Sequence, residues 1–213
     1  MRESFKFTKN PYPGFFIDLE GLDGSGKSTQ ARILKNNLIS KGFKVFSTKE
    51  PTTGIIGELI KKSLIHQIHF SSSTLQLLFT ADRLEHLKNE LIPALEKSKI
   101  VITERYFWST VAFGGINLDK NWLLNLNKFC IIPDLTIFLD VPAKICAKRL
   151  ITRKNLELFE KEKTLIAARK NYLWLIKQFP SRIKITNGNL KINEVSQNLL
   201  YEVFKNDKIK KLK

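Results

Sequence analysis

Short apolar segments alternate along the chain with longer segments in which apolar residues recur at helical spacing. Residues 15–20 read Phe-Phe-Ile-Asp-Leu-Glu, which predicts a buried strand, and further β-rich segments follow at 44–48, 100–103, 135–139 and 182–185. Strands that alternate with helices in this way form a mostly parallel sheet with helices on both faces. The pattern therefore predicts an α/β fold.

Helical periodicity occupies the segments between these strands. Apolar residues share one helical face at 29–38 and 158–179, and residues at helical spacings also predict a helix at 73–95. A further helix should begin near Ala143. Within the second segment, Pro93 disfavours a helical backbone at the residue before it, Ile92.

Nothing in the chain divides it into separate domains. Its 213 residues, 43% of them hydrophobic, can build the core of a single domain over residues 1–213, and no linker or internal repeat interrupts it. The lysine-rich end, 205–213, is expected to fray. No apolar run approaches the length of a membrane span, and residues 1–13 lack the apolar block of a secretory signal, so a cytoplasmic protein with no membrane partner is expected.

The chain is strongly basic. Lys and Arg number 36 against 20 Asp and Glu, for a formal net charge of +16. Such an excess suits anionic ligands and raises the question of nucleic-acid binding. The lysines are scattered over different elements, however, and do not form one stripe with interleaved aromatic residues. A solvated surface explains them better, and a nucleic-acid partner is not expected.

The most specific motif of the chain is a phosphate-binding loop. Residues 21–28 read Gly-Leu-Asp-Gly-Ser-Gly-Lys-Ser, between a predicted strand and a predicted helix as this motif requires. Its glycines permit a ring of inward-pointing amides, Lys27 brings positive charge to the β- and γ-phosphates, and the Ser28 hydroxyl suits magnesium. ATP and Mg²⁺ are thus implied. The nucleotide-binding residues expected here are Gly21, Leu22, Asp23, Gly24, Ser25, Gly26, Lys27, Ser28 and Thr29.

Polar residues also follow the other predicted strands. Glu50 comes after the second strand, Glu104 after the third and Asp140 after the fourth. Ligands of parallel sheets gather at the carboxyl ends of the strands, so these residues and the phosphate loop should converge on one crevice. A basic segment beginning at Arg149 lies between two predicted helices, and residues 149–160 form a candidate lid.

Several blocks of sequence occur in an order that is typical of one enzyme family. They are residues 20–30, 50–54 with 57–58, 77–83, 104–106 with 109 and 112–113, and 133–135 with 139–142. On these blocks the chain resembles the thymidylate kinases, a branch of the P-loop nucleoside monophosphate kinases, from Phe15 to the last helix. The resemblance implies a three-layer P-loop fold with a mostly parallel five-stranded sheet and a short basic lid. It also implies a homodimer that transfers the γ-phosphoryl group of Mg-ATP to dTMP, giving dTDP and ADP.

The resemblance assigns residues to the acceptor nucleotide. Asp23 would approach the 3′-hydroxyl of the deoxyribose, Phe79 would stack on thymine, and Arg83, four residues further along a helix, would donate to the base. Ordinary core packing is the alternative for Phe79. Arg105 would hold phosphate near the point of transfer, and Ser109 would contact the acceptor.

Glu50 and Pro51 resemble a turn at the floor of the acceptor pocket. The proline would fix the backbone there, and Glu50 would help to hold the metal or an arginine. A structural ion pair is an equally good interpretation of Glu50.

The chain also departs from the family pattern. Glu104 stands where many relatives have Asp, and either it or Glu50 would join Ser28 at the metal. Lys49 stands where the family commonly has an arginine, and a lysine ammonium lacks the planar donor fork with which a guanidinium grips two phosphate oxygens. Gly114 offers no side chain where a Gln or Thr usually reads the thymine edge, so the resemblance supplies the residues of phosphoryl transfer but no residue that reads this edge.

A further departure lies inside the phosphate loop, where Gly24 replaces the arginine of some family members. Positive charge for the transition state would then come from Arg149 and Arg153 in the lid, beside Lys27 and Arg105.

Two other functions stay open from the sequence. The first is a kinase of another pyrimidine nucleotide or of a deoxynucleoside, because Gly114 lacks a base-reading side chain. The second is a nucleotide-binding or nucleic-acid-binding P-loop protein without kinase activity, which the large positive charge and the departures at Glu104 and Lys49 would also fit. Comparing dTMP, dUMP, dCMP and thymidine as acceptors separates these possibilities.

Overall fold

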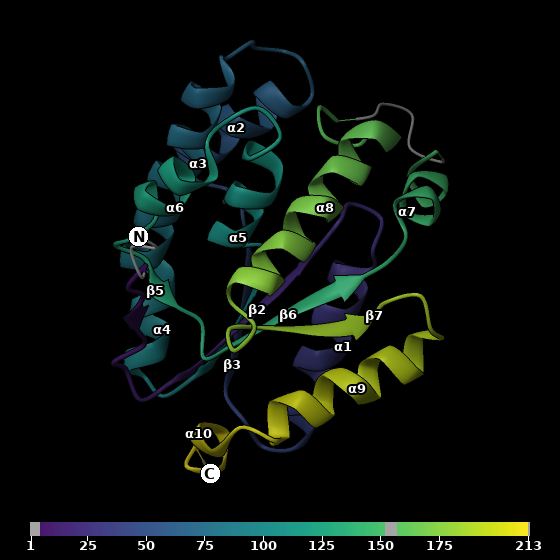
Figure 1. Ribbon diagram of the computed structural model, residues 1–213. Coiled ribbons are helices and arrows are strands. Elements are labelled where there is room, and N and C mark those ends of the chain that lie inside the picture. The colour runs from purple at the N-terminus through teal and green to yellow at the C-terminus, as the bar shows by residue number, and fades with distance from the viewer. Residues whose placement is uncertain (1–4, 152–156, 213) are drawn as a thin grey trace.

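The computed structural model describes residues 5–151 and 157–212. Within this part of the chain, five strands form one parallel sheet in the order β3-β4-β2-β6-β7 (Figure 1). The strands are β2 (Phe15–Gly21), β3 (Val45–Lys49), β4 (Ile100–Glu104), β6 (Leu135–Asp140) and β7 (Ile183–Asn187). Each coincides with a predicted strand to within one or two residues, so the α/β class and the parallel sheet are confirmed.

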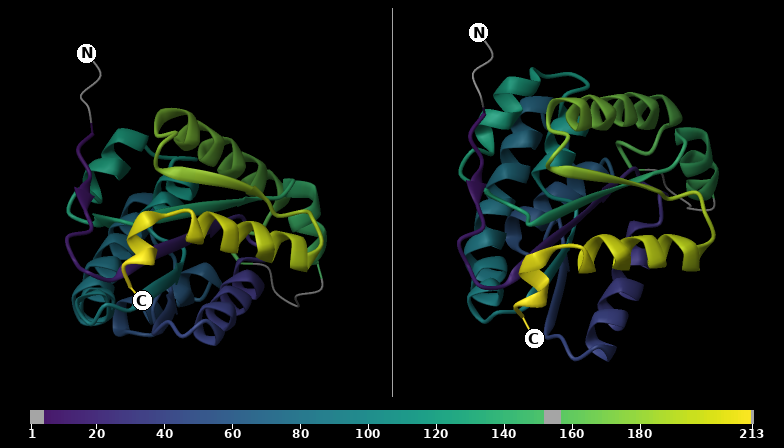
Figure 2. Two further views of the ribbon diagram at one scale, coloured as in Figure 1. Left: turned by 90° about the horizontal axis from the view of Figure 1, so that it is seen from below. Right: turned by 60° about the horizontal axis from the view of Figure 1, so that its bottom comes forward.

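The sheet lies between two layers of helices (Figure 2). Because successive side chains of a strand point to opposite faces, Phe15, Ile17 and Leu19 of β2 face one layer while Phe16 faces the other. The first layer contains α1 (Lys27–Ser40) and α9 (Ile192–Phe204). The second contains α4 (Ile92–Glu96), α5 (Phe107–Ser109), η2 (Thr110–Gly114), α6 (Lys120–Leu126) and α8 (Glu162–Gln178).

The helical segment predicted at 73–95 is continuous but not regular. It consists of α3 (Ser72–His86), a π-helical turn η1 (Leu87–Leu91) and α4. The expectation that Pro93 would remove Ile92 from the helix is wrong, since Ile92 has φ −61° and ψ −50°. Pro93 has no N–H to donate, and the π-helical turn before it changes the hydrogen-bonding pattern at that point.

The predicted helix at 158–179 begins four residues later than expected, at Glu162. The reason is a contact with α2 (Ile55–Leu64): the amide of Leu158 donates to the carbonyl of Leu64 at 2.9 Å. Leu158 and Phe159 then pack against the small apolar cluster of α2 and α3. A tertiary contact therefore replaces the helical turn that periodicity predicted.

Both ends of the described chain are attached to the body of the molecule. Near the N-terminus, β1 (Thr8–Lys9) pairs in parallel with β5 (Ile131–Ile132). Near the C-terminus, α10 (Asp207–Lys210) buries Ile209 completely, and Lys208 lies 3.0 Å from Asp134. The expectation of a frayed tail is therefore wrong for residues 205–212. No helix in the described ranges combines the length and apolar character needed to cross a bilayer.

Candidate active site

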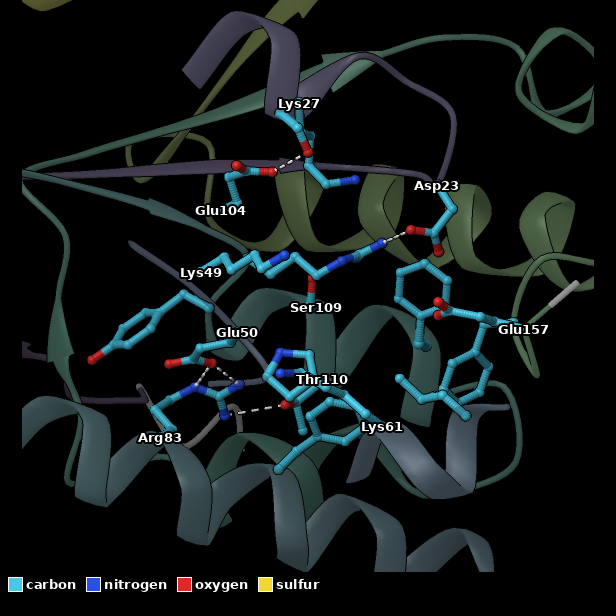
Figure 3. A pocket seen from close by; sticks show the side chains of 18 of the residues that line it. Asp23, Lys27, Lys49, Glu50, Lys61, Arg83, Glu104, Ser109, Thr110 and Glu157 are labelled. Carbon is cyan, nitrogen blue, oxygen red and sulfur yellow. Dashed lines mark hydrogen bonds and ion pairs between the residues drawn. The ribbon is translucent and has the colours of Figure 1, made fainter. Parts of the chain in front are cut away.

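One cleft of about 490 Å³ lies at the carboxyl ends of the strands. The phosphate loop lines it, together with Glu50 after β3 and Glu104 at the end of β4. Figure 3 shows Lys27 and Glu104 at one end and the pair of Arg83 and Glu50 at the other. Asp140, also expected here, does not line the cleft and instead forms an ion pair with Arg169 at 2.8 Å. The predicted convergence thus holds for three strand ends and is wrong for the fourth.

The phosphate loop is pressed against α7 (Ala143–Leu150) at Gly24. Its backbone has φ +80°, and a Cβ atom there would lie 2.6 Å from the carbonyl oxygen of Cys146. Both the left-handed backbone and this backbone contact exclude a side chain. The arginine that some family members carry at this position could not be accommodated without moving the loop or the helix.

Lys27 extends over the loop from the first turn of α1. Its Nζ donates to the carbonyl oxygens of Gly21 at 2.9 Å and Leu22 at 2.8 Å. Burial, assisted by the positive charge of Arg105, lowers the pKa of Lys27 to about 8, although neighbouring carboxylates act in the opposite direction. The lysine is therefore a nearly buried cation, which a phosphate chain would stabilise in its charged form.

Ser28 and Glu104 form the oxygen-rich side of the cleft. Ser28 lies in the first turn of α1 and Glu104 is the last residue of β4. The Ser28 hydroxyl donates to Oε2 of Glu104 at 2.5 Å. A hydroxyl and a carboxylate oxygen are donors that Mg²⁺ prefers, so the donor set fits this metal. The carboxylate of Glu50 is instead occupied by ion pairing, which leaves Glu104 as the carboxylate beside Ser28.

Arg105 lies between the phosphate loop and η2. Its Nη2 is 2.5 Å from Oδ1 of Asp23, its Nη1 donates to Ser109 at 3.0 Å, and its guanidinium sits 4.9 Å from the ring centroid of Phe113. Burial acts to lower the pKa of Arg105, but Asp23, Tyr172 and Glu20 outweigh it and the pKa lies above its usual value. The backbone of Arg105 is left-handed, with φ +70°. Left-handed backbone is uncommon for a residue with a side chain, so the surrounding structure must hold Arg105 in it.

Arg83 is held at the opposite end of the cleft with a guanidinium that is almost fully buried. Glu50 accepts from Nε at 2.8 Å and lies 2.7 Å from Nη2. Nη1 donates to Thr110 at 3.1 Å and to Asn127 at 2.7 Å. Two sides of the guanidinium are thus fixed, and the ion pair identifies the partner of Glu50 that the sequence left open.

Phe79 lies between two environments. It packs against the cluster of Ile60, Leu64 and Leu75, and it also lines the cleft. Core packing and base stacking are therefore compatible for this half-buried ring. Lys49, the departure from the family arginine, is exposed at the edge of the same cleft.

A thymidylate kinase family model matches residues 19–199 of the chain. The chain belongs to the thymidylate kinase family. Members of this family are ATP-dependent nucleoside monophosphate kinases, and this chain is one of them.

Similar proteins have the same assignment over most of their length. A probable thymidylate kinase of Pyrococcus horikoshii is 40% identical over 194 residues, which cover 88% of this chain and 94% of that protein. One of Thermococcus gammatolerans is 39% identical over 197 residues, with the same coverage of 88% and 94%. One of Staphylothermus marinus is 39% identical over 168 residues, covering 76% of this chain and 82% of that protein.

In this thymidylate kinase family member, the sequence did not reveal the function of Glu20. Its buried carboxylate accepts from the amides of Tyr106 at 3.0 Å and Ser109 at 3.1 Å, and from the hydroxyls of Ser109 at 2.7 Å and Tyr172 at 2.6 Å. Burial, then the charge of Glu20, raises the pKa of Tyr172. An acidic residue in a buried strand directly before the loop was the available signal.

The lid prediction falls partly outside the described residues. Arg153 belongs to residues 152–156, whose structure is not described. Arg149, on α7, donates from Nη1 to the carbonyl oxygen of Gly24 at 3.1 Å and so lies against the phosphate loop. After the gap, Glu157 and Phe159 line the cleft.

Proposed function

We propose that the protein transfers the γ-phosphoryl group of ATP to dTMP, giving dTDP and ADP. The observation that carries this proposal is the continuity of one cleft from the phosphate loop at Lys27 to the buried Arg83, with Arg105 between them. Such a cleft can hold a triphosphate at one end and a pyrimidine base at the other. The names of the relatives agree with this choice of acceptor.

The chain's own residues position two anions and neutralise their repulsion. Lys27 and the loop amides hold the β- and γ-phosphates, and Arg105 grips the phosphate of the acceptor. Asp23 and Ser109 hold the guanidinium of Arg105 from either side. An oxygen of the acceptor phosphate is already anionic, so it can attack the γ-phosphorus without a dedicated general base. The terminal bridging oxygen of ATP leaves with ADP.

Magnesium, when bound, supplies positive charge to the β- and γ-phosphate oxygens. Ser28 and Glu104 would hold it, because their oxygens lie next to each other beside Lys27. Arg149 is proposed to supply further positive charge from the side of the lid, residues 149–160, together with Arg153.

We also propose a cytoplasmic homodimer that consists of a single domain. Leu77 and Leu84, seven residues apart on α3, are 48% and 43% exposed and share one outward face of that helix. An exposed apolar stripe on a helix beside the sheet supports association of two copies.

A coupled assay of ADP release tests the function directly. With Mg-ATP as donor, dTMP should be the best acceptor among dTMP, dUMP, dCMP and thymidine. Lys27→Ala, checked by circular dichroism for an intact fold, is the negative control and should lose roughly 100-fold or more of turnover. Preference for another acceptor, or undiminished activity of folded Lys27→Ala, would contradict the proposal.

A further inference from the structure

Gln76 combines burial with an unsatisfied polar group. It lies on α3, is only 2% exposed and lines the cleft. Within the part of the chain that the structure describes, its buried Oε1 has no hydrogen-bond partner. A buried carbonyl oxygen without a partner is costly, so its presence in a cleft indicates that a ligand donates to it.

The position of this amide depends on Gly114. A Cβ atom at residue 114 would lie 2.8 Å from Cδ, 2.9 Å from Cγ and 3.1 Å from Oε1 of Gln76. The backbone of Gly114 is not left-handed, so the glutamine side chain, and not backbone strain, is what opposes a larger residue there. Gln76 therefore occupies the space that a side chain at position 114 would take.

The neighbours of Gln76 belong to the end of the cleft away from Lys27. Arg83 lies seven residues further along α3, on the same helical face, and Phe79 lies between them and lines the cleft. Thr110, on the same π-helical turn as Gly114, accepts from Arg83. Gln76 thus shares a wall with the residues that would contact the acceptor base.

We propose that Gln76 reads the hydrogen-bonding edge of the acceptor's pyrimidine base and takes over the function of a side chain at position 114. This inference rests on the proposed function. Thymine presents N3–H as a donor and O4 as an acceptor, and a carboxamide offers a matching acceptor and donor. Uracil has the same edge, so Gln76 does not distinguish dTMP from dUMP.

Arg83 gives this recognition its direction. A carboxamide alone could rotate to match the N3 acceptor and the 4-amino donor of cytosine. The guanidinium of Arg83 is a donor only and is fixed by Glu50, Thr110 and Asn127, so it accommodates a carbonyl at position 4 and opposes an amino group. Together the two side chains select a 4-oxo pyrimidine over cytosine.

The first test is Gln76→Leu, which removes the amide at similar volume. The KM for dTMP and for dUMP should rise about 10- to 100-fold, with the KM for ATP unchanged and kcat changed less. The activity with dCMP should not fall, so the ratio of kcat/KM for dTMP over dCMP should decrease. Thr80→Val is the matched control, because its buried hydroxyl on α3 bonds to the backbone of Gln76 and does not line the cleft; it should leave these constants unchanged.

The second test displaces the amide from the other side. Gly114→Ala should push the flexible end of Gln76 away, raising the KM for dTMP while the melting temperature changes little. In a Gln76→Ala background the same substitution should have no further effect on this KM.

The outcomes separate this inference from the function on which it rests. If the wild type releases ADP with dTMP but Gln76→Leu keeps the wild-type KM, Gln76 is not the base-reading residue. The same follows if Gly114→Ala is silent, or equally harmful with and without Gln76. If the wild type phosphorylates none of the monophosphates, the proposed function itself fails. Should Gln76→Leu not fold, the Gly114→Ala cycle decides the question.

Discussion

At the scale of single residues, two buried carboxylates organise the cleft. Glu20 is 0% and Glu50 is 4% exposed, and each is surrounded by donors. Glu50 accepts from Arg83 and lies 3.2 Å from Nδ1 of His86, while Glu20 binds the start of the segment that carries Ser109. A buried carboxylate is costly unless its oxygens accept hydrogen bonds, so each one fixes the groups around it.

Glu20→Gln is expected to misplace Arg105, although Glu20 itself does not line the cleft. An amide has one acceptor oxygen in place of two and adds an N–H that faces other donors, so the segment around Ser109 should shift. We expect kcat to fall about 10- to 100-fold, because small displacements of positioning groups are costly in phosphoryl transfer. Tyr172→Phe, which removes only one donor to Glu20, should lose less. Steady-state kinetics with melting curves would show this, and full kcat in Glu20→Gln would contradict it.

The pKa of Lys27 predicts how ATP binding depends on pH. Burial lowers this pKa to about 8, whereas bound phosphates favour the charged ammonium and raise it. Protons should therefore be taken up on binding around pH 8, and Mg-ATP affinity should fall as the pH rises above that value. Calorimetry in two buffers of different ionisation enthalpy measures the uptake. The arginine of Lys27→Arg stays charged throughout this range, so this variant should bind Mg-ATP without taking up a proton. A wild-type affinity that is constant from pH 7 to 9 would exclude this mechanism.

At the scale of elements, contacts between segments far apart in the chain shape the site. The phosphate loop rests on α7 through Gly24, and α3 faces the cleft with Arg83 while Leu84 points outward. The phosphate loop and α3 each line the cleft on one side and meet another surface on the other. A substitution at such a contact therefore affects both the packing of the element and ligand binding in the cleft.

Gly24→Ala tests the contact between loop and helix. The added Cβ would combine left-handed strain with a 2.6 Å approach to the backbone of Cys146. We expect a loss of about 2–4 kcal/mol in the free energy of unfolding and weaker ATP binding. Gly42→Ala is the matched control, since Gly42 has φ +89° and nothing within 4 Å of the added Cβ. It should cost about 1 kcal/mol and leave ATP binding unchanged. Chemical denaturation measures the free energy of unfolding of both variants. If Gly24→Ala and Gly42→Ala lose the same amount, the contact between Gly24 and the backbone of Cys146 does not contribute.

At the scale of the whole molecule, the sheet lies between two helical layers and the cleft opens at the carboxyl ends of its strands. The outer face of α3 is exposed to solvent. The exposed Leu77 and Leu84 lie on that face, and the buried Gln76 and Arg83, each the residue before one of them, lie on an adjoining side of the helix. An interface there would place a partner copy against the same helix that carries Gln76 and Arg83 at the acceptor end of the cleft.

Replacing both leucines by glutamate should convert the proposed dimer into monomers. Charges buried in an apolar interface are unpaired and costly, so association should weaken at least 100-fold. Sedimentation equilibrium measures the change, and a Ser73→Glu variant at the start of α3 provides a charge control. A wild type that is monomeric at all concentrations, or a double variant that still dimerises, would place the interface elsewhere or remove it.

The sequence alone determined the features that depend on neighbours in the chain. Strand positions follow from short apolar runs, and the phosphate loop follows from glycines, a lysine and a serine at fixed spacing. The helix at 158–179 was predicted too long and Ile92 was expected to leave its helix, because a contact with α2 in one case and a π-helical turn in the other prevailed over local preference.

Only the tertiary structure decided which residues meet across the cleft. Glu20 and Tyr172, or Gln76 and Gly114, are separated by many residues and carry no shared pattern, yet they lie within contact distance. Local preferences are set by covalent neighbours and survive in any window of sequence. The environment of a buried polar group is set by distant segments that the folded sheet brings together, and so it is expressed only in three dimensions.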